Sequence, residues 1–187
     1  GFAFQAELTS AGAMEKLFAD AKTAMGSIDI AVNTVGKVLK KPMAEISEAE
    51  FDEMSAVNSK SAFFFLKEAG RAVSDNGKIC TLVTSLLGAY TPFYAAYAGT
   101  KAPVEHYTRA ASKELGERGI SVTAIGPGPM DTPFFYLAEG ADARPKLGQQ
   151  RPERKTAAPG RTAADGEGIC PIRFRPADPL RRSAALQ

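Results

Sequence analysis

Hydrophobic and polar residues along this chain of 187 residues repeat with two different periods. Residues 1–8 alternate with a period of two and are rich in phenylalanine, which predicts a strand. Thr9 or Ser10 can cap a following helix, and Gly26 can end it. Residues 28–33 are a compact apolar run, typical of a buried parallel strand. The apolar positions of the helix between them recur at helical spacing, at Met14, Leu17, Phe18, Ala21 and Met25.

The next stretch predicts two helices. Ser47 and Glu50 have the spacing of a capping box, in which each residue satisfies a free backbone N–H at a helix start. We expect that helix to carry Phe51 and Met54 inward. Residues 61–73 are apolar around much of a helical circumference, which indicates burial in the core or in a subunit contact.

The pattern then returns to strands. A turn at residues 75–77 separates the preceding helix from a strand at residues 78–84. A long helix is predicted over residues 95–116, with a kink at Pro103, whose ring removes one backbone hydrogen bond. Residues 120–125 form a further strand.

Strands that alternate with helices of this length predict an α/β fold, with a parallel sheet covered by helices on both faces. Ligands of such sheets bind outside the carboxyl ends of the strands. Three unusual loops leave strand ends in this chain, at residues 33–36, from residue 85 onward and at residues 127–132. We therefore expect these loops to meet and to form a site.

Tyr97 and Lys101 follow the second of these loops and lie one helical turn apart. A phenol loses its proton near pH ~10, and an ammonium held ~4–6 Å away can lower that pKa by roughly 1–3 units. Such a shift suits general acid–base catalysis. Ser85, twelve residues upstream of Tyr97, supplies a hydroxyl that could bind the reacting oxygen. The alternative is an exposed helix that merely carries an aromatic ring and a charge.

Composition narrows the classes of partner. Hydrophobic residues at 44% and charged residues at 24% fit one globular domain, and a net charge of +2 indicates neither a nucleic-acid nor a membrane partner. Cys80 and Cys170 have no metal-ligand spacing and form no disulfide framework, so we expect no metal and a reducing compartment. No signal-like or membrane-spanning apolar run is present in the sequence, and we expect a cytoplasmic protein.

Charge and composition change near residue 140. Residues 1–140 hold 13 Lys and Arg against 16 Asp and Glu, whereas residues 141–187 hold 10 against 5. The second part also has 6 of the 12 prolines, 8 arginines and little apolar periodicity, which indicates disorder. One hypothesis for it is a shifted reading frame in GC-rich coding sequence, and another is a basic tail that binds nucleic acid. The start at Gly1 within a strand pattern indicates a fragment.

Taken together and in order, the loop at 33–36, Asn58, Ser85, the Tyr97-x-x-x-Lys101 motif and residues 127–132 resemble the short-chain dehydrogenase/reductase family. The surrounding sequence resembles its 3-oxoacyl-[acyl-carrier-protein] reductase-like branch. The resemblance covers residues 1–140, as a partial NAD(P)-binding domain. It implies a Rossmann-like, doubly wound parallel sheet whose first βαβ unit and last strand are missing.

The resemblance also implies roles for single residues. Tyr97 would be the general acid in reduction and the base in oxidation, and Lys101 would lower its pKa and hold the nicotinamide ribose. Ser85 would steady the substrate oxygen. Asn58 would support a water-linked proton relay to Lys101.

The implied cofactor is NADP or NAD. Asn33 and Gly36 would border its adenosine side, and Pro127, Gly128 and Thr132 its nicotinamide side. The family's Gly-rich pyrophosphate turn occurs nowhere in these residues, and the residues that choose between the two cofactors are missing. Glu7 stands where the family usually has an Asp that faces the adenine.

The predicted function is therefore hydride transfer between a nicotinamide and a small carbonyl or alcohol substrate. The alternative is a catalytically inactive fragment that retains the fold and associates through its helices. By analogy, homo-oligomers would form through the helices at residues 61–73 and 95–116. His106 is expected to be structural, whereas three other side chains either line the substrate entrance or belong to the core: Phe93, Phe134 and Phe135.

Overall fold

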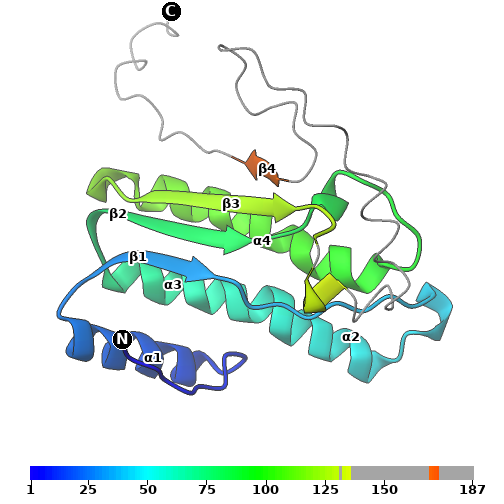
Figure 1. Ribbon diagram of the computed structural model, residues 1–187, viewed down its shortest axis with the longest axis horizontal. Helices are drawn as coiled ribbons and strands as arrows, with labels where there is room; N and C mark the ends of the chain where they lie inside the picture. The colour runs from blue at the N-terminus through cyan, green and yellow to red at the C-terminus, as the bar shows by residue number, and fades with distance from the viewer. Residues whose placement is uncertain (131, 136–168, 173–187) are drawn as a thin grey trace, which may run out of the picture.

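The computed structural model describes residues 1–130, 132–135 and 169–172. In the described residues three parallel strands and a short fourth strand form one sheet, and in Figure 1 the arrows of β1, β2 and β3 point the same way, with β4 beside β3. The sheet order is β1-β2-β3-β4. The α/β fold and its parallel sheet are thus confirmed. The strands are β1 (Ile28–Asn33), β2 (Val73–Leu82), β3 (Ser121–Pro127) and the antiparallel β4 (Ile169–Ile172).

Within the described residues, four α-helices accompany the sheet, and short 3-10 or π turns join the elements. The α-helices are α1 (Ala11–Met25), α2 (Glu48–Met54), α3 (Ser61–Ala72) and α4 (Ala95–Glu114). The 3-10 turns are η1 (Met43–Glu45), η3 (Ser85–Leu87) and η4 (Gly116–Arg118), and η2 (Ser55–Lys60) is a π-helical turn. None of the described helices is both long enough and apolar enough to cross a membrane.

The predicted helix ends are confirmed by their caps. Ser10 accepts a hydrogen bond from the Ala13 amide, and Gly26 ends α1 at φ 80°, where a side chain would be strained. The capping box is present, because Ser47 and Glu50 each bind the other's backbone amide.

The three large helices pack against a single face of the sheet. Neighbouring residues of a strand point to opposite faces, and the paired residues Ala31, Ile79 and Val122 all point toward α1 and α3. Ala124 lies on the same face, where it packs against α4. We call this side, with Ala31, Ile79, Thr81, Val122 and Ala124, the covered face.

The opposite side of the sheet carries no described helix. Its residues include Ile30 and Val32 of β1, which are 66% and 53% exposed. Cys80 of β2 pairs with Val32, and Thr123 of β3 pairs with Cys80. We call this side the open face. The described helices thus cover one face of the sheet, and the expectation that both faces of residues 28–33 are buried is wrong.

Other predictions about single elements also need correction. Residues 1–7 form no strand, because no described strand pairs with them. Phe51 points outward and is 51% exposed, whereas Met54 is buried as expected. Pro103 lies inside α4 without interrupting it. The turn at residues 75–77 falls within β2, where the register with β1 shifts and Asn76 has φ 64°.

β4 falls within the part of the chain predicted to be disordered. Residues 169–172 pair with Ala124–Pro127 of β3, so the prediction does not hold for these four residues. The remainder of residues 141–187 lies outside the described residues.

Candidate active site

The loops that follow the three parallel strands meet at one end of the sheet and border a cavity of about 520 Å³. The loop after β1 supplies Thr34 and Gly36, and the loop after β3 supplies Pro127 and Gly128. Residues 83–86 come from the end of β2, and the start of α4 adds the side chains discussed below. The convergence expected from the sequence is therefore confirmed.

Tyr97 lies in the first turn of α4 and faces this cavity. Its ring centroid is 6.2 Å from that of Tyr94 and 6.4 Å from that of Phe134, so aromatic rings flank the phenol. Burial raises the pKa of Tyr97 above its ordinary value, and a hydrogen bond with the Thr84 side chain partly opposes this rise. The expectation of a lowered pKa is thus wrong for this structure, because desolvation outweighs any effect of the nearby ammonium.

The hydroxyl that binds Tyr97 comes from Thr84, the residue before the predicted Ser85. Thr84 is buried just beyond β2, and its Oγ1 also accepts a hydrogen bond from the Leu86 amide, 3.3 Å away, at the start of η3. Ser85 lines the same cavity. The sequence analysis named Ser85 and not Thr84, because spacings of twelve and thirteen residues before Tyr97 look alike.

Lys101 lies one turn after Tyr97 and is buried. Its Nζ donates hydrogen bonds to the carbonyl oxygens of Val35, at 3.0 Å, and Leu82, at 3.1 Å. The ammonium thus links the carboxyl ends of β1 and β2. Burial lowers the pKa of Lys101 to about 8, since the charged form loses its hydration. Among the described residues that line the cavity, no other side chain carries a charge.

Gly36 shows how closely the loop after β1 approaches this lysine. A Cβ at Gly36 would lie 3.0 Å from Lys101 Nζ and 3.4 Å from Asn58 Oδ1. Such contacts are tighter than ordinary carbon contacts, so a side chain here would displace the ammonium. The glycine is explained by this close approach.

Asn58 lies in the π-helical turn η2 and is completely buried. Its Oδ1 accepts a hydrogen bond from the Lys37 amide, and its Nδ2 donates one to the Lys37 carbonyl, both at 2.9 Å. Nδ2 also contacts Thr100 Oγ1 at 3.1 Å. Asn58 therefore fixes the loop after β1 against α4, and all its polar atoms are used.

The residues predicted to border the cofactor divide into two groups. Gly36, Pro127, Gly128 and Thr132 line the cavity, together with Tyr97 and Lys101. Asn33 does not: it is buried, and its Oδ1 accepts a hydrogen bond from the Val35 amide at 2.9 Å. Asn33 therefore shapes the loop rather than the cavity wall.

Several further candidates are placed by the structure. Phe134 and Phe135 line the cavity, whereas Phe93 does not and is about half exposed. His106 is exposed on α4 and lies outside the cavity. Glu7 is exposed and binds Thr9, whose side-chain hydrogen bond lowers the pKa of that carboxyl.

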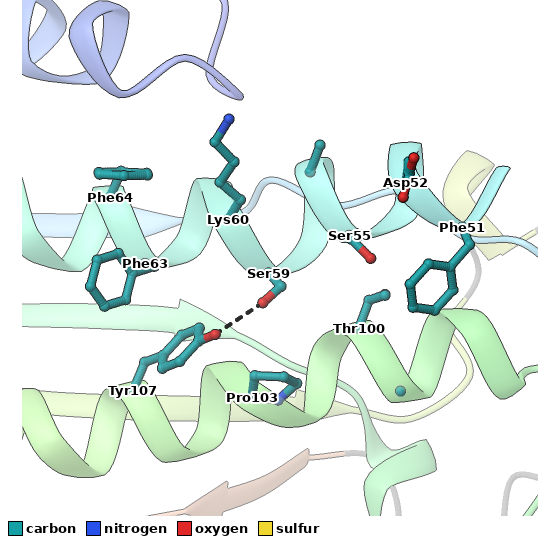
Figure 2. A pocket seen from close by; sticks show the side chains of 12 residues that line it. Phe51, Asp52, Ser55, Ser59, Lys60, Phe63, Phe64, Thr100, Pro103 and Tyr107 are labelled. Atoms are coloured by element: carbon teal, nitrogen blue, oxygen red, sulfur yellow. Dashed lines mark hydrogen bonds between the residues drawn. The ribbon is translucent and has the colours of Figure 1, made fainter. Parts of the chain in front are cut away.

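A second hollow, of about 730 Å³, lies between α4 and the continuous stretch formed by α2, η2 and α3. Figure 2 shows Ser59 hydrogen-bonded to Tyr107 across it, at 3.2 Å. Phe63 packs edge-on against Tyr107, with 5.3 Å between ring centroids. Phe51 and Phe63 are both about half exposed beside this groove, which we call the helix groove.

Comparison with known proteins gives consistent matches. Residues 2–164 match the family model described as enoyl-(acyl carrier protein) reductase. A short-chain dehydrogenase/reductase of Aspergillus novofumigatus is 31% identical over 135 residues, which are 72% of this chain and 51% of that protein. A hydroxynaphthalene reductase-like protein of Metarhizium brunneum is 33% identical over 151 residues, or 76% and 56% of the two chains.

Solved structures extend the comparison to three dimensions. A putative dehydrogenase from Burkholderia cenocepacia with bound NADP is 76% identical, with a TM-score of 0.75, over 78% of this chain and 55% of that one. A dehydrogenase/reductase from Sinorhizobium meliloti is 33% identical, with a TM-score of 0.68, over 71% and 53%. This chain thus spans about half the length of the relatives that it matches.

Proposed function

Because this chain belongs to the short-chain dehydrogenase/reductase family, whose members are oxidoreductases, we propose that it serves NAD(P)-dependent hydride transfer between a nicotinamide and a carbonyl or hydroxyl carbon. The observation that carries this proposal is the convergence of Tyr97, Thr84 and Lys101 on one cavity at the carboxyl ends of the strands. The relative from Burkholderia cenocepacia binds NADP, which supports a nicotinamide cofactor here.

The residues around the cavity suit the nicotinamide half of such a cofactor. Gly36 leaves room beside the ammonium of Lys101, which is a hydrogen-bond donor for ribose hydroxyls. Pro127, Gly128 and Thr132 form the facing wall. The nicotinamide supplies or accepts the hydride when it is bound. No Gly-rich turn for the pyrophosphate occurs in these 187 residues, so the fit extends to the nicotinamide side alone.

The proton chemistry falls to Tyr97. Its raised pKa keeps the phenol protonated at neutral pH, which suits donation of a proton to the substrate oxygen in reduction. Thr84 binds the phenol and lies beside Ser85, so one of these hydroxyls steadies the substrate oxygen. Lys101 places a positive charge near that oxygen and favours a phenolate when the reaction runs as oxidation.

Asn58 has a positioning role in this scheme. Its side chain holds the backbone of Lys37, and the same loop presents the Val35 carbonyl to Lys101. The water-linked relay from Asn58 to Lys101 stays a prediction.

The test is a fluorescence titration of the purified chain with NADH and NADPH, followed by turnover assays with a β-keto thioester and a bicyclic aromatic ketone. We expect micromolar binding of one cofactor, and loss of turnover by about 10²- to 10⁴-fold in Tyr97→Phe. Millimolar or weaker binding of both cofactors would instead support the inactive fragment. The two substrates separate the 3-oxoacyl reaction of the resembling branch from the aromatic chemistry named for the hydroxynaphthalene reductase-like relative.

A matched pair of variants tests which hydroxyl, that of Thr84 or that of Ser85, acts together with Tyr97 on the substrate oxygen. Thr84→Val removes the group that binds Tyr97, whereas Ser85→Ala removes its neighbour. We expect the larger loss of turnover in Thr84→Val. A larger loss of turnover in Ser85→Ala would instead indicate that Ser85 steadies the substrate oxygen.

The same proposal includes self-association through the two long helices. Phe51 of α2 and Phe63 of α3 are half exposed beside the helix groove, and such aromatic side chains are enriched at protein interfaces (Figure 2). Light scattering should show an oligomer that Phe63→Glu dissociates. A monomer in the wild type at micromolar concentration would exclude this part of the proposal.

A further inference from the structure

Tyr94 lines the cavity of about 520 Å³ at the start of α4, three residues before Tyr97. Its ring centroid lies 6.2 Å from that of Tyr97, with an angle of 60° between the ring planes. Phe134 also lies beside Tyr97, with 6.4 Å between ring centroids and an angle of 53°. The phenol assigned to the proton chemistry therefore has two further aromatic rings as neighbours.

The ring of Tyr94 is held in place by its surroundings. It is 7% exposed and belongs to a buried cluster with Met54 of α2. The Nζ of Lys40 lies over the ring, 5.7 Å from its centroid, a distance at which a cation is attracted to an aromatic face. Phe134, by contrast, is 41% exposed and less confined. Tyr94 therefore provides the more rigid aromatic surface of the cavity.

The backbone just before Tyr94 is strained. Phe93 has φ 72°, in the left-handed region that bulky side chains rarely adopt. Its ring is about half exposed, so packing of the ring does not explain this conformation. Its carbonyl accepts a hydrogen bond of 2.8 Å from the Lys41 amide, in the loop after β1. Strained backbone persists where surrounding contacts hold it, and it is common at ligand-binding sites. Here it fixes the direction in which the chain enters α4, and with it the place of Tyr94.

The rest of the described lining is mostly apolar. It holds no acidic side chain, and its one charged group, the ammonium of Lys101, already donates hydrogen bonds to the carbonyls of Val35 and Leu82. A cavity with this lining binds its ligands mainly through apolar and aromatic contacts. Apolar side chains from the loop after β1, from η3 and from the segment after β3 complete the wall: Val38, Leu86, Met130 and Phe135.

We propose that Tyr94 determines the substrate specificity of this site, and that it selects a ketone, or the corresponding alcohol, whose reacting carbon is attached to an aromatic ring. With the substrate oxygen at the Tyr97 hydroxyl, the aromatic ring of the substrate lies against the ring of Tyr94. Two aromatic rings with centroids about 4.5–7 Å apart gain free energy beyond that of apolar contact, which an aliphatic ketone does not. This inference rests on the proposed function, because that function places the reacting oxygen at Tyr97.

The experiment compares two ketones of matched size on the full chain, without cofactor. 1-Tetralone has an aromatic ring attached to its carbonyl carbon, and 1-decalone has the same two fused rings in saturated form. Dissociation constants are measured by ligand-observed NMR titration. We expect 1-tetralone to bind about 2- to 10-fold more tightly than 1-decalone. Because no hydride is transferred, this preference is measured separately from cofactor binding and turnover, on which the proposed function depends.

Matched substitutions test whether Tyr94 is responsible. Tyr94→Leu removes the aromatic ring but keeps an apolar side chain, and should lower the ratio of the two affinities to about one. Tyr94→Phe keeps the ring and should keep the preference. Tyr90→Leu makes the same change as Tyr94→Leu at a residue that is 100% exposed and lies outside the cavity lining, so the ratio should not change. A partial loss of folded protein weakens both ligands alike, so the ratio still reports on Tyr94.

Equal affinities of the wild type for the two ketones would overturn the proposal. A preference that survives Tyr94→Leu, or one that Tyr90→Leu removes, would also overturn it. A wild type that prefers 1-tetralone but neither binds a cofactor nor turns over would contradict the proposed function, and would still support an aromatic site at Tyr94.

Discussion

The covered and open faces of the sheet are built from the same strands, yet they differ in nearly every physical respect. Ile79 and Val122 on the covered face are almost completely buried, whereas Ile30 and Val32 on the open face are more than half exposed. All four are large apolar residues. Hydrophobicity along a strand therefore shows which side chains are stabilised by burial, but whether they are buried depends on which other segments pack against them.

The largest expected difference between the faces concerns stability. Ile79→Ala deletes a fully buried side chain from the cluster shared by α1, α3 and the sheet, and should lower the free energy of unfolding by about 3 kcal/mol. Val32→Ala should change it by less than about 0.5 kcal/mol. Urea unfolding followed by circular dichroism measures both. Equal losses would show that the open face is buried in solution.

The strength of the sequence argument differed between elements for a physical reason. Local signals such as the Ser47–Glu50 capping box and the Gly26 stop depend on neighbours in the chain, and the structure confirms them. The exposure of Ile30 and Phe51 depends on which distant segments pack nearby. Periodicity alone carries no information about that packing.

The candidate active site also contains some features that the sequence pattern predicts and others that depend on how distant segments pack. Convergence of the three loops follows from parallel strands, whose carboxyl ends must lie together, and was predictable. The choice between Thr84 and Ser85 depends on the last turn of the backbone after β2, which spacing does not resolve. The raised pKa of Tyr97 depends on its burial, and Phe134, whose ring centroid lies 6.4 Å away, comes from a distant part of the sequence.

A second prediction compares buried polar contacts at the site with those of the open face. Asn58→Ala leaves the amide and carbonyl of Lys37 without their partners and should lower the free energy of unfolding by about 2 kcal/mol. Thr123→Val on the open face removes one long contact to the Ile79 carbonyl, at 3.5 Å, and should cost less than about 0.5 kcal/mol. Thermal unfolding of the two variants would contradict the comparison if Thr123→Val were the less stable.

A third prediction concerns pH. The pKa of Lys101 is lowered from 10.5 to about 8 in the folded chain. Below pH 8 the Lys101 side chain is charged in both the folded and the unfolded state. The folded state is therefore destabilised by the full cost of burying the charged ammonium. Between pH 8 and about 10.5 the folded state loses the proton first, and stability rises by at most about 1.4 kcal/mol per pH unit.

The measurement is urea unfolding at pH 8, 9 and 10 for the wild type and Lys101→Met. The difference in unfolding free energy between the two proteins should shift with pH in favour of the wild type. Taking the difference removes the titration of groups far from Lys101, which both proteins share. A flat difference would mean that Lys101 keeps an ordinary pKa.

The smallest expected effect compares adjacent residues of β2 that point to opposite faces. Thr81 is completely buried on the covered face, and its hydroxyl lies 2.9 Å from that of Thr108 on α4. Thr81→Val keeps the shape but removes this hydrogen bond, and should cost about 1 kcal/mol. Cys80→Ser changes a partly exposed side chain on the open face and should cost less than about 0.5 kcal/mol. Guanidinium unfolding measures both variants. Should Cys80→Ser be the more destabilising, a segment that covers the open face must already be in place in the isolated chain, and the distinction between the two faces would fail.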